Sequence, residues 1–159
     1  MFKKILVPLD GSELAAKILP DVATMAKCMG AEIILLHVCY FPLAADMESL
    51  PPKMEKTAEE IVARECALFL GQVAKDLQVQ GVKATQQCVE GLPAREIIAF
   101  AHNNNIDLIA LATHGKGEVA WILGSTAEKV VAHATVPTLL YRVVEAKVPE
   151  LKEKIVGMP

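Results

Sequence analysis

The sequence lacks the features that mark several classes of protein. It has no cluster of lysine and arginine, and its 16 basic residues against 19 acidic ones give a net charge of −3. Nucleic-acid binding needs a concentrated basic face, so the composition argues against a nucleic-acid partner. No apolar stretch reaches the roughly 18 residues that a membrane-spanning helix needs, so no association with a membrane is predicted.

Cysteine is scarce and shows none of the spacings that carry chemistry. Cys28, Cys39, Cys66 and Cys88 lie far apart, without a C-x-x-C pair, and no group of histidine, cysteine and carboxylate residues has metal-ligand spacing. The apolar stretch at the N-terminus stops at Pro8, too early for a secretory signal. We therefore expect a cytoplasmic protein with free, buried thiols and no metal site of its own.

What is present suits one compact domain. The chain has 159 residues, of which 53% are hydrophobic and 22% are charged, a balance that buries a full core. We place the domain at residues 1–144. Residues 145–159 are more charged, contain Pro149 and are interpreted as a C-terminal tail.

Five apolar runs alternate with segments of helical spacing. Strands are predicted over Lys3–Leu9, Glu32–Cys39, Val82–Glu90, Asp107–Ala112 and Pro137–Val144. Helices are predicted over Leu14–Met29, Thr57–Val79, Pro93–Asn103 and Ser125–Val131, with a loop over Tyr40–Lys53. Pro20 should kink or break the first of these helices. This alternation predicts an α/β fold with a mostly parallel sheet and helices on both faces.

A ligand site is expected beyond the carboxyl ends of the strands, where the strand order reverses. There Asp10 should face a glycine-containing loop that leads into the helix starting at Gly124-Ser125-Thr126. Glycines permit close approach of an anion, and the unpaired N–H groups of a helix start favour phosphate. Lys116 would add a positive charge. The alternative is structural: Ser125 only caps the helix, the glycines only make turns, and Asp10 only forms a turn.

Several segments together resemble one known family. They are Val7–Ser12, Leu36–Val38, Gly91–Ala94, Asp107–Gly115 and Val136–Leu140, and they occur in the order of the universal stress protein family. The resemblance runs from Phe2 to about Arg142. It implies an open five-stranded sheet of Rossmann-like, adenine nucleotide α-hydrolase-like type, with strand order 3-2-1-4-5.

The resemblance also implies a nucleotide site for ATP or AMP, with Mg²⁺ carried by the nucleotide. The family fingerprint is Gly-x-x-Gly, nine residues, then Gly-[Ser/Thr]. Here Ala112 replaces the first glycine, and eight residues separate Gly115 from Gly124. The residues predicted to bind the nucleotide are Pro8, Leu9, Asp10, Val38, Ala112, Thr113, His114, Gly115, Lys116, Gly124, Ser125 and Thr126.

Function is expected to be regulatory. The family's fifth strand often pairs with the same strand of a second subunit, so we expect a homodimer through Pro137–Val143 and an unidentified protein partner. No catalytic residue is assigned, because no general base is evident beside Gly115. A scaffold without ligand and a slow ATP hydrolase remain alternatives. His37 is interpreted as a hydrogen-bonded histidine at the edge of the core, with ligand contact as the alternative.

Overall fold

The computed structural model describes residues 1–39, 52–113 and 123–143. Five strands form one sheet in the order β3-β2-β1-β4-β5, and every neighbouring pair is parallel. The strands are β1 (Lys4–Pro8), β2 (Glu32–Cys39), β3 (Lys83–Glu90), β4 (Leu108–Ala112) and β5 (Thr138–Tyr141). The predicted fold and strand order are confirmed.

The helices are α1 (Glu13–Ala16), α2 (Leu19–Met29), α4 (Pro52–Val79), α5 (Pro93–Asn103) and α6 (Ser125–His133). The break predicted at Pro20 is confirmed, because α1 ends before it and Pro20 stands in the first turn of α2. A proline is tolerated there because the N–H that it lacks would have no partner within the helix. Gly30 ends α2 with φ of 65°, a left-handed conformation that favours glycine.

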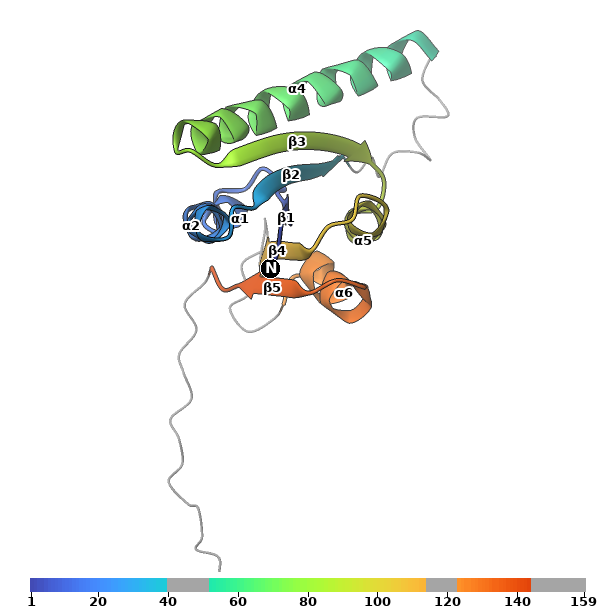
Figure 1. The fold of residues 1–159 in the computed structure, drawn as a ribbon. Coiled ribbons are helices and arrows are strands. Elements are labelled where there is room, and N and C mark those ends of the chain that lie inside the picture. Colours follow the sequence, from blue (N-terminus) through green and yellow to red (C-terminus); the bar gives the residue numbers. More distant parts are fainter. Residues whose placement is uncertain (40–51, 114–122, 144–159) are drawn as a thin grey trace, which may run out of the picture.

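The helices cover both faces of the sheet. Figure 1 shows α1 and α2 on one side, α5 and α6 on the other, and α4 running along β3. Each face has its own apolar core: Ile5 and Val7 of β1 pack on the side of α2 and α4, whereas Leu6 packs on the side of α5 and α6. All three are fully buried, as expected for a strand covered on both faces.

Two predicted boundaries were wrong by three residues or more, and the others differ by one or two residues at most. The long helix begins at Pro52 rather than Thr57, since proline is favoured in a first helical turn. The fifth strand covers only Thr138–Tyr141, because its partners on β4 run only from Ile109 to Ala112. Among the described helices, none is both long and apolar enough to span a membrane. The predicted tail lies outside the described residues.

Candidate functional site

A cavity of about 400 Å³ lies at the carboxyl ends of β1 and β4. Nine of the twelve residues predicted to bind a nucleotide line it: Pro8, Leu9, Asp10, Val38, Ala112, Thr113, Gly124, Ser125 and Thr126. The other three, His114, Gly115 and Lys116, lie outside the described residues. The fold therefore gathers four separate sequence segments around one space.

The rest of the lining is apolar and was not predicted from the sequence. It consists of Ala15, Leu36, Pro93, Ile97, Leu111 and Ala127. The alternation along β2 could have identified Leu36, because it faces the same way as Val38. Ile97 comes from the interior of α5, and only the packing of that helix brings it to the cavity. These residues give the cavity a largely hydrophobic lining, as is usual for small-molecule sites.

Asp10 forms a turn and also lines the cavity. Its Oδ1 accepts hydrogen bonds from the Ser12 N–H at 2.9 Å and the Ser12 hydroxyl at 2.6 Å. Gly11 between them has φ of 82°, which suits glycine in a tight turn. The described residues offer Oδ2 no donor, so this oxygen can accept from a ligand. The turn expected for Asp10 is therefore present, and it holds the carboxylate in place through Oδ1 alone.

The N-terminus of α6 also lines the cavity. Gly124 is the N-cap residue, and its own N–H donates to the Thr113 carbonyl at 2.9 Å. No side chain caps this helix, and Ser125 occupies the first helical position. The alternative in which Ser125 serves only as the cap is therefore wrong. The N–H groups of the first helical turn have no partner within the helix and carry a partial positive charge.

His37 lies at the end of β2 on the other face of that strand. Its Nδ1 is 2.7 Å from the Leu9 carbonyl oxygen, and the ring is half-buried. A carbonyl only accepts, so Nδ1 carries the proton. The predicted hydrogen-bonded histidine is confirmed.

The cysteines differ from expectation. Cys66 of α4 and Cys88 of β3 form a disulfide with their Cα atoms 6.4 Å apart, and Cys28 is exposed. Only Cys39 is both free and buried, and burial together with the Glu90 carboxylate raises the pKa of its thiol. The expectation of four free, buried thiols was wrong because the pairing depends on how α4 packs over β3.

Fold and cavity together define an α/β protein with a ligand-sized pocket at the reversal of its strand order. Residues 1–142 match the universal stress protein family. The chain belongs to that family.

Named relatives agree with this assignment. The chain is 32% identical over 144 residues to universal stress protein MJ0531 of Methanocaldococcus jannaschii, covering 89% of this chain and 83% of the relative. It is 31% identical over 148 residues to universal stress protein YxiE of Bacillus subtilis, covering 89% of this chain and all of that one.

Solved structures share the fold. Protein MJ0577 of M. jannaschii superposes with a TM-score of 0.79 at 30% identity, covering 92% of this chain and 99% of that one. A universal stress protein in complex with cAMP gives a TM-score of 0.66 at 18% identity, covering 90% and 98% of the two chains. The universal stress protein of Archaeoglobus fulgidus in complex with dAMP gives 0.58 at 18% identity, covering 87% and 97%.

Proposed function

We propose that the chain binds an adenine nucleotide, ATP or AMP, and acts as a dimeric regulatory module in the stress response. One observation carries this proposal: a single cavity joins the Asp10 carboxylate to the uncapped N-terminus of α6. Its volume of about 400 Å³ lies in the range of small-molecule sites.

Asp10 and the N-terminus of α6 suit opposite ends of a nucleotide. A carboxylate oxygen accepts hydrogen bonds from ribose hydroxyls and repels phosphate, which puts the nucleoside beside Asp10. The first N–H groups of α6 favour an anion, which puts the phosphates beside Ser125 and Thr126. The apolar side chains of Leu36, Val38 and Ile97, which line the cavity, suit the flat face of a base.

The choice of adenine follows the family. The chain belongs to the universal stress proteins, and two proteins of this fold are held in complexes with cAMP and dAMP. His114, Gly115 and Lys116, predicted at the phosphates, stay part of the proposal. Mg²⁺ would enter with the nucleotide, held by its phosphates. The cytoplasm remains the predicted location.

Calorimetry on the full chain, stripped of nucleotide, tests the proposal. ATP and AMP are titrated separately, with and without Mg²⁺, into wild type and into Val131→Ala, a control on the exposed side of α6. We expect both proteins to bind both nucleotides with one site per chain. Absence of heat with either nucleotide would leave a scaffold without ligand. Phosphate release faster than about 1 s⁻¹ would indicate an enzyme instead.

We propose that the dimer forms through β5 and its flanks, Pro137–Val143. β5 is an edge strand of the sheet, and Leu139 on it is 38% exposed. An apolar edge strand invites pairing, and a two-fold partner satisfies its free backbone groups.

Light scattering coupled to size exclusion tests the dimer. Leu139→Lys brings two like charges together across a two-fold axis, so we expect the variant to elute as a monomer. Leu68→Lys is the matched control, because Leu68 is 67% exposed on α4, along the opposite edge of the sheet from β5 (Figure 1). A dimer of unchanged strength in Leu139→Lys, or a monomeric wild type, would exclude this interface.

A further inference from the structure

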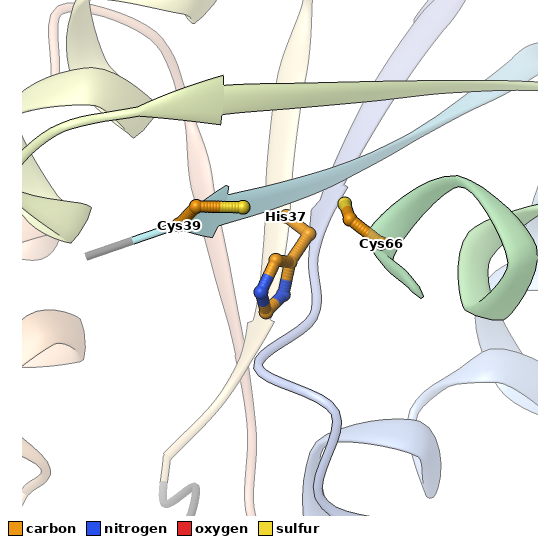
Figure 2. A group of neighbouring side chains, drawn as sticks. All are labelled: His37, Cys39 and Cys66. Carbon is orange, nitrogen blue, oxygen red and sulfur yellow. The ribbon is translucent and has the colours of Figure 1, made fainter. Parts of the chain in front are cut away.

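Sulfur and imidazole side chains gather between the sheet and α4. One ligand atom each from His37, Cys39 and Cys66 lies within 4.8 Å of the other two. Figure 2 shows that His37 and Cys39 extend from β2 and Cys66 from α4. Cys66 is 5% exposed and Cys39 is 9% exposed, so the cluster is largely shielded from water.

The strand register adds a fourth member. His37 and Cys39 are two residues apart on β2 and therefore point to the same face. Cys88 of β3 is the register partner of His37, so it lies beside the ring on that face, and it is bonded to Cys66. Three cysteine sulfurs and one imidazole thus come from β2, β3 and α4.

These residues are the ligands that zinc prefers. Three thiolates and one imidazole form a common structural zinc site, with Zn–S bonds of about 2.3 Å and ligand atoms about 3.7 Å apart. The ligand atoms of His37, Cys39 and Cys66 lie within 4.8 Å of one another, so they need to approach by up to roughly an ångström, and the Cys66 and Cys88 sulfurs must separate once their bond is reduced. The bond from Nδ1 to the Leu9 carbonyl orients the His37 ring and leaves the Nε2 lone pair for a metal, the supporting contact that metal-binding histidines usually have.

We propose that the reduced chain binds one Zn²⁺ through His37, Cys39, Cys66 and Cys88, and that forming the Cys66–Cys88 disulfide releases it. The disulfide form in the structure is the metal-free state, because its two sulfurs cannot also act as thiolate ligands. The proposal does not rest on nucleotide binding, since none of the four ligands lines the cavity, and Val38, between the two β2 ligands, points to the opposite face of that strand.

Release of zinc through formation of the Cys66–Cys88 disulfide needs a two-electron oxidant. We propose that this oxidant is a peroxide. The Cys66 and Cys88 thiolates give up two electrons and form one S–S bond. The O–O bond of hydrogen peroxide breaks, takes up the two electrons and two protons, and leaves as two waters. Zn²⁺, left with Cys39 and His37 alone, dissociates.

Cobalt absorption spectroscopy on the untagged full chain tests the site. The chain is reduced with a phosphine, freed of metal and titrated with Co²⁺ without oxygen. We expect one Co²⁺ per chain, with thiolate-to-cobalt charge transfer and the visible bands of tetrahedral cobalt, and displacement by Zn²⁺. Peroxide should abolish these bands as two thiols are consumed. This arm uses Cys28→Ser, because exposed Cys28 would react by itself, and the variant otherwise serves as the matched control.

Two variants distinguish cobalt binding at this site from cobalt binding by any reduced thiol of the chain. Cys39→Ser should weaken the charge-transfer band and the affinity. His37→Gln should keep the band, because the thiolates remain. Its affinity for cobalt should fall by more than the about 10- to 100-fold that removal of a supporting contact costs. His37 is half-buried, so its replacement disturbs the packing less than replacement of buried Cys39 does. Circular dichroism confirms that each variant is folded. A reduced chain without the band, a band unchanged in both variants, or equal binding by the disulfide form would overturn the proposal.

Discussion

Asp10 holds Ser12 through two hydrogen bonds to a single carboxylate oxygen, Oδ1, and neither bond uses Oδ2. Ser12 in turn caps α1, since its hydroxyl accepts from the Ala15 N–H at 3.1 Å. The turn and the helix start behind it are therefore built on the residue that we assign to the nucleoside. A side chain held in this way loses little freedom when a ligand binds.

Asp10→Ala should weaken AMP and ATP binding alike. The residue acts on the nucleoside, and a hydrogen bond to a charged group contributes about 1.5–3 kcal/mol, or roughly 10- to 100-fold in affinity. Asp10→Asn is the matched control, because its amide oxygen can still accept from Ser12 while the charge is lost. Calorimetry measures the affinities. If AMP binds Asp10→Ala as tightly as wild type, Asp10 is not part of the site.

Gly124→Val should abolish ATP binding and leave the fold and the dimer intact. Gly124 has φ of −57° and ψ of 142°, a conformation open to any residue, so valine causes no backbone strain. Its branched side chain would instead stand where a phosphate must approach the N–H groups of α6. Gly124→Ala should fall between valine and wild type. Unchanged ATP affinity in the valine variant would show that phosphate lies elsewhere.

Stability in acid should depend on Asp107. Its Oδ2 accepts from the backbone N–H groups of Lys3 at 2.8 Å and Lys4 at 2.9 Å, and these bonds lower the pKa of the carboxyl. A lowered folded-state pKa stabilises the protein above the unfolded value of about 3.9, and this contribution is lost as the pH falls through the folded pKa. Urea unfolding should therefore show Asp107→Ala less stable than wild type at pH 7.

The difference between Asp107→Ala and wild type should shrink below about pH 4, as the wild-type carboxylate is protonated. Glu65→Ala, at an exposed position on α4, is the control and should unfold at the wild-type urea midpoint. A difference for Asp107→Ala that is the same at pH 7 and pH 3 would mean that the charge of the carboxylate does not matter.

Gly91→Ala should lower the free energy of unfolding by about 1–3 kcal/mol, the usual cost of a strained backbone conformation. Gly91 has φ of 140°, and an added Cβ would lie 2.7 Å from Cγ of Glu96. Urea unfolding in wild-type and Glu96→Ala backgrounds separates the two causes. A cost that persists without the Glu96 side chain comes from the backbone. A variant as stable as wild type in both backgrounds would refute the argument.

Local sequence patterns predicted most of the fold. Uninterrupted apolar runs such as Glu32–Cys39 indicate strands buried on both faces, and their alternation with helices leaves few topologies. The starts at Pro93 and Ser125 were predicted correctly, whereas Pro52, which also suits a first helical turn, was assigned to the preceding loop. Nine of the predicted nucleotide-binding residues line one cavity because motifs that end parallel strands necessarily meet at the same edge of the sheet.

The order of the elements and the motifs at their ends therefore follow from local sequence, since both depend on residues close together in the chain. Three contacts became visible only in the tertiary structure. Cys88 is the register partner of His37, and Cys66 is bonded to Cys88. Ile97 lines the cavity. Those contacts depend on strand register and on how α4 and α5 lie across the sheet. These are properties of packing between segments far apart in the chain, and no local spacing encodes them.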